Sequence, residues 1–387
     1  MWKKSLILGV ISVLLFSILP LQNADAEEIN LAPNARSAVL IDQDTGTIIF
    51  DKNSHDRLPL ASITKVMTML LIMEAIDSGK ISYNDKVRIS EKAASMGGSQ
   101  IFLEVGEEMV VQDLLKGIAV ASGNDATVAM AEYIAGTEEE FIKMMNKRAE
   151  ELGLKDTHFV NTNGLPEADH YSTAFDIAIM SRELLKHEKI TDFTKIYQDY
   201  LRKDSTEPFW LVNTNRLVRF YEGVDGLKTG YTNEAKFCLS ATAKKGSFRV
   251  IAVVMGEPNS KTRNKEVSDL LDYAFNQYKN EVLFKKDQLI TDVEISKGSK
   301  MILPLKAPYQ VGILLRKGEK VEDYEQILSV KGHIQAPIKK DDVLGKLQIV
   351  KNGKVINEIP LVAADEVSKA NLIQMFKRVL RKQVFVD

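Results

Sequence analysis

The chain has 387 residues, enough for two or three domains, and its formal net charge is −2 with 45% hydrophobic and 27% charged residues. This near-neutral composition excludes the strongly basic surface of a nucleic-acid-binding protein, so no nucleic-acid partner is expected. The single cysteine, Cys238, excludes an internal disulfide framework, and its apolar neighbours predict a buried, inert thiol.

Residues 1–26 have the pattern of a cleavable secretory signal. Lys3 and Lys4 precede an apolar stretch over residues 6–21, and Ala24-Asp25-Ala26 provides a small-residue cleavage site. The mature chain would then begin near Glu27 and lie outside the cytoplasmic membrane. An uncleaved N-terminal anchor is the alternative, although the apolar stretch is interrupted and short for a bilayer span.

Ser62 and Lys65 form the only Ser-x-x-Lys string of the chain, and the apolar run 66–73 that follows predicts a buried helix. Residues three apart share a helix face, so both side chains would point into one space, with Ser62 near the positive N-terminal end. A lysine can take the proton of a serine when burial or nearby positive charge lowers its pKa. Taken alone, the pair fits a solvated helix start better than a catalytic pair.

A second string, Ser122-Gly123-Asn124, is followed by Asp125 and predicts a tight turn. The turn would present a hydroxyl and an amide to a substrate. Ser122 would relay a proton to a leaving amine, and Asn124 would hydrogen-bond a substrate amide.

A third string, Lys228-Thr229-Gly230, lies between a turn signal at Asp225-Gly226 and a strand-like stretch that starts at Cys238. Lys228 and Thr229 on a strand edge would offer a positive charge and a hydroxyl to a carboxylate, while Gly230 would let the substrate backbone come close. Lys228 by itself is also typical of an edge-strand lysine that discourages aggregation.

Helical and strand patterns alternate over residues 27–282, which predicts an α+β domain with an antiparallel sheet and helices on its faces. The predicted helices are 111–135, 138–152 and 265–278, and the predicted strands are 37–41, 47–50 and 249–254. Residues 283–362 change to short alternating segments between turn signals, as in a small all-β sandwich. Its predicted strands are 289–295, 300–305, 309–315, 343–350 and 354–361.

The last segment, 363–387, has an apolar stripe at helical spacing opposed by basic residues. The stripe consists of Leu372, Ile373, Phe376, Val379, Leu380 and Val384, and the basic face of Lys377, Arg378, Arg381 and Lys382. This pattern is typical of an amphipathic helix that lies in a membrane surface. A terminal helix docked on its own domain is the alternative.

In this order the three strings resemble the S-x-x-K, S-D-N and K-T-G motifs of the penicillin-binding protein and serine β-lactamase superfamily. The middle string has Gly123 in place of the aspartate. In this it resembles the low-molecular-mass penicillin-binding proteins, the D-alanyl-D-alanine carboxypeptidases of peptidase S11 type. That narrower resemblance also rests on the strings 96–107, 159–165 and 170–176. Within the group, segments 95–100 and 210–216 resemble the DacF type of Gram-positive spore formers.

The resemblance implies a role for each matching residue. It implies Ser62 as nucleophile, Lys65 as its base, Ser122 and Asn124 as relay and substrate clamp, and Lys228 and Thr229 as carboxylate-recognition residues. It also implies an oxyanion hole from the backbone N–H groups of Ser62 and Tyr231, close substrate approach at Gly230, and a further carboxylate-binding cation at Arg263. The family often has histidine where Tyr231 stands, which preserves only the backbone role.

The resemblance therefore implies a serine carboxypeptidase that removes the terminal D-Ala from peptidoglycan stem peptides ending in D-Ala-D-Ala, through a Ser62 acyl-enzyme that β-lactams also form. No cofactor is expected, and the five histidines show no metal-ligand spacing, so they are interpreted as surface or structural residues.

Two alternatives are a β-lactamase of the same superfamily and a non-catalytic, membrane-tethered wall-binding module. The lactamase is disfavoured because no Glu-x-x-Leu-Asn string follows the second motif, and class A lactamases need that glutamate to deacylate. The binding module is disfavoured because every motif side chain is intact.

Overall fold

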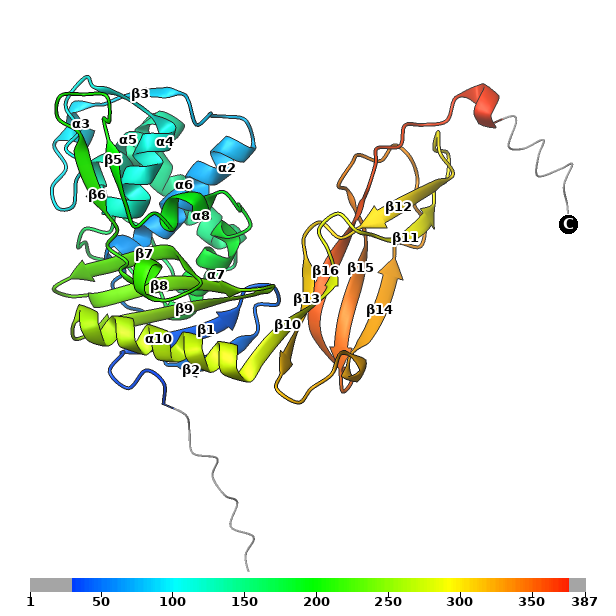
Figure 1. The fold of residues 1–387 in the computed structure, drawn as a ribbon. Helices are drawn as coiled ribbons and strands as arrows, with labels where there is room; N and C mark the ends of the chain where they lie inside the picture. The colour runs from blue at the N-terminus through cyan, green and yellow to red at the C-terminus, as the bar shows by residue number, and fades with distance from the viewer. Residues whose placement is uncertain (1–29, 376–387) are drawn as a thin grey trace, which may run out of the picture. The chain divides into compact units, whose positions relative to one another are not determined.

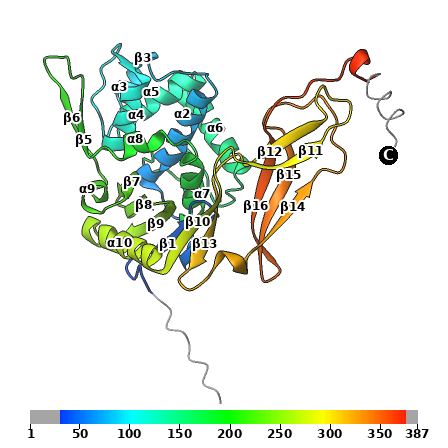
Figure 2. The same ribbon diagram turned by 45° about the vertical axis from the view of Figure 1, so that its right-hand side comes forward.

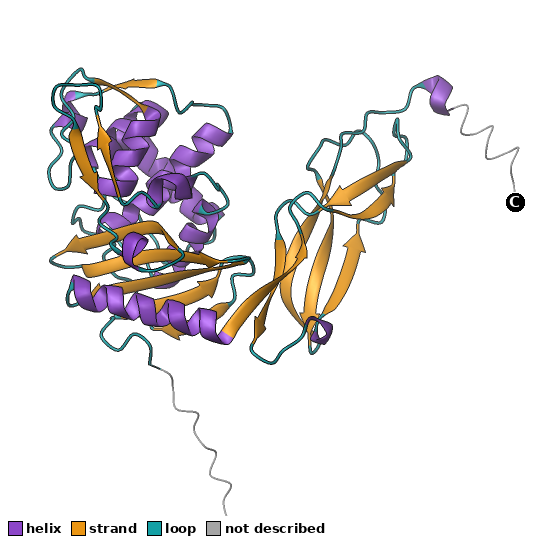
Figure 3. Cartoon of the chain, in the orientation of Figure 1, coloured by secondary structure: helices purple, strands orange, loops and turns teal. Residues whose placement is uncertain are grey.

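The computed structural model describes residues 30–375, which form a larger α+β domain and a smaller β-rich domain (Figure 1). Each domain is described by itself. The predicted secretory signal, residues 1–26, lies outside the described residues, and so does most of the predicted amphipathic helix, from residue 376 onward. The predicted fold class, α+β followed by an all-β domain, is confirmed (Figure 3).

An antiparallel five-stranded sheet forms the centre of the larger domain, in the order β2-β1-β9-β8-β7. Its strands are β1 (Ser37–Asp42), β2 (Ile48–Lys52), β7 (Val224–Thr232), β8 (Lys236–Lys245) and β9 (Phe248–Glu257). The middle of β9 is a continuous apolar run because helices cover both faces of the sheet. The strands predicted at 37–41, 47–50 and 249–254 are confirmed, and β7 lies at an edge of the sheet.

Helices pack on both faces of this sheet (Figures 1 and 2). On one face lies α10 (Ser260–Gln277), whose apolar stripe is buried and whose start is capped by the Asn259 side chain. On the other lie α7 (Ala174–Leu184) and, behind it, α2 (Lys65–Asp77). The buried helix predicted after Ser62 is confirmed, since every residue from Lys65 to Met73 is buried.

The single helix predicted at 111–135 is wrong. The chain instead forms α4 (Val111–Lys116), a π-helical turn η2 (Gly117–Ala121) and α5 (Asn124–Ala135). Apolar periodicity continues through the break, but Ser122 adopts a left-handed backbone with φ 65° and interrupts the hydrogen-bond ladder. The expected turn at Ser122 therefore exists inside what the pattern suggested was one helix.

The remaining elements of the larger domain are short, apart from α6 (Glu138–Glu151), which confirms the helix predicted at 138–152. They are η1 (Ala61–Thr64), α3 (Glu91–Ala94), α8 (Ile190–Thr194), α9 (Leu217–Phe220), and two two-stranded sheets, β3 (Lys86–Arg88) with β4 (Glu108–Val110) and β5 (Gln198–Leu201) with β6 (Phe209–Val212). The turn predicted at Asp225-Gly226 is also corrected, because both residues lie within β7 at a bulge in its pairing with β8.

The smaller domain contains two antiparallel sheets around one apolar core. One pairs β10 (Tyr278–Phe284) with β13 (Val311–Arg316), and the other has the order β11-β12-β16-β15-β14. The bounds of the latter strands and of the short helix η3 are β11 (Leu289–Glu294), β12 (Ile302–Lys306), η3 (Val321–Asp323), β14 (Glu325–Val330), β15 (Val343–Lys351) and β16 (Lys354–Ala363). Because β10 pairs with β13, the change of architecture falls at its start and not at residue 283.

The strand β14 was missed because all of its residues are exposed, which leaves no alternation to detect. Residues 363–370, expected to begin the terminal helix, instead complete the β domain: Ala363 ends β16, and the buried Val367 bridges to Ile338. Within residues 30–375, no helix has both the length and the apolar character needed to cross a bilayer.

Candidate active site

Ser62 lies in the 3-10 turn η1, directly before α2, and this turn is held by a chain of hydrogen bonds. The Thr64 hydroxyl donates to the carbonyl oxygen of Ala61 at 2.8 Å and lies 2.7 Å from His170 Nε2. The Val160 N–H donates to His170 Nδ1, so the buried ring is neutral and carries its proton on Nε2. Burial lowers the pKa of His170 to about 4, which keeps this tautomer over the physiological range.

Lys65 is fully buried and makes three polar contacts through Nζ. Nζ lies 3.1 Å from Ser62 Oγ, and it donates to Asn124 Oδ1 and to the carbonyl oxygen of Asn163, each at 2.7 Å. Burial, with the charge of Lys228 added, holds the Lys65 pKa well below its usual range. A neutral amine has two N–H donors and one lone pair. Because the two carbonyl oxygens accept both donors, the lone pair is left facing Ser62 Oγ.

The second string contributes Ser122 and Asn124 from the two sides of the break between η2 and α5. Asn124 is occupied by protein: its Oδ1 accepts from Lys65, and its Nδ2 donates to the carbonyl oxygen of Gly97 at 2.7 Å. Ser122 differs, because its Oγ is buried and has no hydrogen-bond partner within residues 30–375. A buried hydroxyl without a partner costs free energy, and a substrate that hydrogen-bonds Ser122 would remove this cost.

The third string lies on the edge strand β7, which packs against the nucleophile turn: a Cβ at Gly230 would be 2.9 Å from the Leu60 carbonyl oxygen. Lys228 is buried, and its Nζ donates to the Thr229 carbonyl oxygen at 2.9 Å. Burial, and then the nearby Arg263 guanidinium, lower the pKa of Lys228 to about 7. The Thr229 hydroxyl donates to Thr214 Oγ1 at 2.7 Å.

Arg263 and Tyr231 differ in burial. Arg263, in the first turn of α10, is buried, and its Nε and Nη2 donate to the neighbouring Asn264 Oδ1 at 3.1 and 2.9 Å. Its charge acts on Lys228, as a second cation of one carboxylate site would. The Tyr231 side chain is half exposed and packs on Phe237, with ring centroids 4.4 Å apart. The expected role of its backbone N–H stays a prediction.

Several residues of the site were missed by sequence reasoning. Asn163 contributes a backbone carbonyl, which no side-chain motif could reveal. Gly164 has φ +88°, and a Cβ there would lie 1.9 Å from the Ala61 carbonyl oxygen, so this glycine permits the close approach of its loop to the nucleophile turn. Residues 159–165 were noted only as family-like, and His170 only as structural.

Glu257, at the end of β9, is a further buried group that the motifs did not indicate. Neither of its oxygens accepts a hydrogen bond within residues 30–375, and the protonated carboxyl group donates to the Glu266 carboxylate. Burial and the neighbouring Glu266 carboxylate raise the pKa of Glu257 to about 8, so it is protonated at neutral pH. Glu266 accepts from the N–H groups of Asn34 and Ala35 at 3.0 and 3.2 Å, and its pKa is lowered.

Cys238 is buried, and burial raises its pKa to about 11, as expected for an inert thiol. No group of three or more His, Cys, Asp or Glu side chains within residues 30–375 is arranged to hold a metal ion. The contacts of Lys65 and the cations near β7 support nucleophilic attack by Ser62, with a neutral lysine as base and cations for an anionic substrate group.

Comparison with known proteins gives matches over nearly the whole chain. The profile of the D-alanyl-D-alanine carboxypeptidase family, peptidase S11, matches residues 23–259, and that of the penicillin-binding protein 5 C-terminal domain matches residues 278–369. D-alanyl-D-alanine carboxypeptidase DacF of Bacillus subtilis (strain 168) is 56% identical over 350 residues, 90% of each chain. DacD of Escherichia coli (strain K12) is 34% identical over 364 residues, 90% of this chain and 92% of that protein.

Solved structures agree with these matches. Penicillin-binding protein 5 from Haemophilus influenzae has a TM-score of 0.69 at 32% identity, covering 87% of this chain and 98% of that one. Penicillin-binding protein D2 from Listeria monocytogenes, in its ampicillin-bound form, has a TM-score of 0.57 at 28% identity, covering 62% of this chain and 98% of that one.

Proposed function

The chain belongs to the D-alanyl-D-alanine carboxypeptidase family, and we propose that it releases the terminal D-Ala of peptidoglycan stem peptides through an acyl-enzyme on Ser62. The family and enzyme class predicted from the three strings are confirmed. The observation that carries the proposal for Ser62 is the contact set of Lys65, whose Nζ lies 3.1 Å from Ser62 Oγ while two carbonyl oxygens accept its N–H groups.

In the acylation step, Ser62 Oγ attacks the carbonyl carbon of the penultimate D-Ala, and its proton passes to Lys65 Nζ. The C–N bond to the terminal D-Ala then breaks, and the leaving amine receives the proton through Ser122, whose hydroxyl has no partner within residues 30–375. The backbone N–H groups of Ser62 and Tyr231 would stabilise the oxyanion. Water hydrolyses the ester and releases the shortened peptide.

Recognition of the free C-terminal carboxylate falls to Lys228, Thr229 and Arg263. A carboxylate in this pocket compensates two buried positive charges that otherwise repel each other, which favours substrates with a free terminus over internal peptide bonds. The same site would accept the carboxylate of a β-lactam, whose reaction with Ser62 gives a stable acyl-enzyme. This fits the ampicillin-bound form of the Listeria protein.

The test is intact-mass spectrometry of the purified protein after penicillin treatment, followed by an assay of D-Ala release from a D-Ala-D-Ala-terminated peptide. The wild type is expected to carry one stable adduct on Ser62 and to release D-Ala, while Ser62→Ala does neither. Ser78→Ala, at the exposed end of α2, serves as the matched control and keeps both properties.

Two results would reject the Ser62 carboxypeptidase mechanism. Rapid loss of the adduct without peptide turnover would indicate a β-lactamase. A wild-type protein that penicillin does not modify would indicate a non-catalytic wall-binding module.

We further propose that the protein is secreted, with a mature chain that begins near Glu27, and is held on the outer face of the cytoplasmic membrane by its last residues. The signal pattern and the opposed apolar and basic residues of the terminus support this. Leu372 and Ile373, the described start of the apolar stripe, are 86% and 67% exposed.

Deleting residues 371–387 tests the tether and spares the buried Val367, which belongs to the β-domain core. The truncated protein is expected in the soluble fraction with unchanged D-Ala release. Membrane association that persists would contradict the tether, and N-terminal sequencing would then distinguish an uncleaved anchor, with residues 1–26 retained, from a processed chain.

A further inference from the structure

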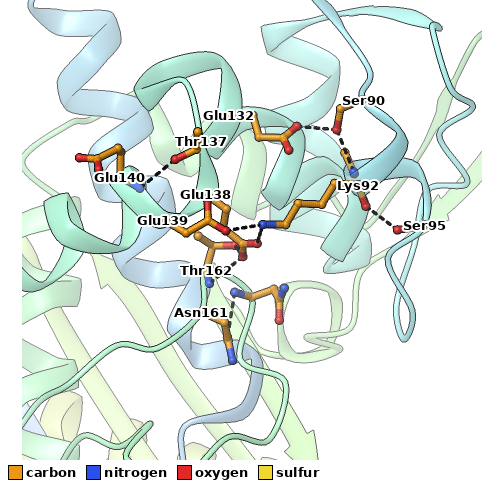
Figure 4. Close-up of polar contacts among 12 residues, drawn as sticks. Ser90, Lys92, Ser95, Glu132, Thr137, Glu138, Glu139, Glu140, Asn161 and Thr162 are labelled. Atoms are coloured by element: carbon orange, nitrogen blue, oxygen red, sulfur yellow. Dashed lines mark hydrogen bonds and ion pairs between the residues drawn. The ribbon is translucent and has the colours of Figure 1, made fainter.

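A partly exposed ion-pair cluster lies beside the loop that carries one of the hydrogen-bond acceptors of Lys65. Lys92 Nζ lies 2.9 Å from Glu138 Oε2 and 2.9 Å from Glu139 Oε1 (Figure 4). The two glutamates are unequal, because the Glu138 side chain is 10% exposed and that of Glu139 is 68% exposed. A nearly buried carboxylate is retained only where partners use it, so the other contacts of Glu138 matter.

The second carboxylate oxygen of Glu138 accepts hydrogen bonds from Thr162. Glu138 Oε1 accepts from Thr162 Oγ1 at 2.8 Å and from the Thr162 N–H at 3.4 Å, and Thr162 is fully buried (Figure 4). Thus one oxygen of the carboxylate binds the ammonium of Lys92 and the other binds a loop. Charge-assisted bonds of this kind are stronger than neutral ones, so they hold the loop firmly.

The same loop is also hydrogen-bonded to α2. Two successive carbonyl groups of the loop accept these bonds. The Thr162 carbonyl oxygen accepts from the Thr68 hydroxyl, and the Asn163 carbonyl oxygen accepts from Lys65 Nζ, each at 2.7 Å. Thr68 lies one helical turn after Lys65 on α2. The loop is therefore fixed between the Glu138 carboxylate on one side and the general base on the other.

The position of the Asn163 carbonyl decides which way the Lys65 lone pair points. If this acceptor moves, one N–H of Lys65 loses its partner, and the amine can turn its lone pair away from Ser62 Oγ. A misplacement of about 1 Å in a reacting group can cost on the order of 100-fold in rate. Because Lys92 balances the charge of Glu138, we expect an effect on position and not one on the local electric field.

We propose that Glu138, held by Lys92, is a positioning residue that keeps the Asn163 carbonyl on Lys65 and thereby directs the base at Ser62. This inference rests on the proposed function, in which Lys65 takes the proton of Ser62. Glu138 touches neither substrate nor Ser62, so its influence runs through Thr162 and the loop.

The test compares Glu138→Ala, Glu138→Gln and Glu139→Ala in the full-length protein, by the rate of penicillin acylation, by kcat and KM for D-Ala release, and by the pH profile of acylation. Glu138→Ala is expected to lower acylation and kcat about 10- to 100-fold, to leave KM within about twofold, and to displace the acidic limb of the profile. Glu138→Gln keeps an oxygen acceptor for Thr162 and retains activity within about threefold. Glu139→Ala removes only the exposed partner of Lys92 and stays within about twofold.

Thr162→Val provides a second route to the same contact, because it removes the hydroxyl donor without emptying the site. It is expected to reproduce much of the loss, and the Glu138→Ala/Thr162→Val protein is expected to be no slower than Glu138→Ala alone, since both changes break one linkage. Thr162→Val alone tests the inference if Glu138→Ala does not fold.

Two outcomes would overturn the inference: folded Glu138→Ala and Thr162→Val proteins that acylate like the wild type, or losses that add fully in the double variant. A wild-type protein that is never acylated would instead reject the proposed function, so the two failures are distinguishable.

Discussion

The buried cations of the active site and the buried lysine of the smaller domain have opposite surroundings. Around Ser62 the larger domain buries two lysines and an arginine: Lys65, Lys228 and Arg263. Among the described residues of the smaller domain, Lys306 is the one buried charged side chain, and it is paired with Asp287 at 2.7 Å and Asp341 at 3.0 Å. The pKa of a buried lysine is therefore shifted in opposite directions at the two places. Pairing raises the pKa of Lys306, while burial lowers those of Lys65 and Lys228.

This difference indicates that the buried cations of the larger domain serve the reaction and that the buried lysine of the smaller domain stabilises the fold. Unpaired buried charge destabilises a fold, and it persists where function needs a shifted pKa. In the smaller domain every shifted Asp, Glu or Lys pKa has the sign that an ion pair gives it, so that domain contributes structure. Variants at both places test this difference.

The largest effect is expected from Lys65→Ala set against Lys306→Ala. Loss of the general base should slow penicillin acylation and D-Ala release by roughly 1,000-fold, measured by stopped-flow acylation and steady-state kinetics. Lys306→Ala should leave both rates within about twofold and lower the thermal unfolding midpoint. A Lys306→Ala protein as slow as Lys65→Ala would refute the division between the domains.

Gly164→Ala should slow acylation by about 100-fold, since its Cβ would lie 1.9 Å from the Ala61 carbonyl oxygen and force the loop away from the nucleophile turn. Gly79→Ala is the matched control, because Gly79 also has a positive φ, +73°, but nothing lies within 4 Å of its Cβ. It should cost about 1 kcal/mol of unfolding free energy, measured by urea denaturation, and leave acylation unchanged. Equal acylation rates in the two variants would contradict the close fit of the loop.

Substrate binding should weaken above pH 7. Lys228, with a pKa of about 7, is charged below that pH and neutral above it, so KM for a D-Ala-D-Ala peptide should rise by about tenfold between pH 6 and 9. Lys228→Arg stays charged over this range and should flatten the rise. A KM that does not change with pH in the wild type would remove Lys228 from carboxylate recognition.

The smallest effect concerns stability. The pKa of Glu257 is about 8 in the folded protein and 4.5 ordinarily, so the folded state binds the extra proton and its stability falls as pH rises from about 4.5 to 8. Glu257→Gln mimics the protonated acid and should gain roughly 1–3 kcal/mol of unfolding free energy at pH 8 and almost none near pH 4.5. Urea denaturation at both pH values measures this.

The smaller domain supplies the contrasting variant. Lys306 lowers the pKa of Asp287, so that carboxylate contributes stability above its ordinary pKa, and the contribution is lost as pH falls through the lowered value. Asp287→Asn should therefore destabilise the protein at pH 8, opposite in sign to Glu257→Gln. The same sign in both variants would show that the two domains do not differ in this respect.

Much of the architecture could be read from periodicity. The range 138–152 predicted α6 almost to the residue. The strands β1 and β9 were recognised because both of their faces are buried, which gives a continuous apolar run. The pattern failed at Ser122, where a left-handed residue divides an apolar helix, and at β14, which has no buried face. Hydrophobic periodicity reports burial, and it is silent where the backbone bends or a strand is exposed.

The chemical groups of the site and their order could be predicted from the sequence, because Ser62, Lys65, Ser122, Asn124, Lys228 and Thr229 are expected to act through side chains that short strings reveal. How Lys65 becomes a base depends on the folded chain. Its two acceptors lie 59 and 98 residues away, and one of them is a backbone carbonyl, a group that every residue has. Its lowered pKa likewise comes from burial and from a second lysine on another element, both of which exist only once the chain has folded.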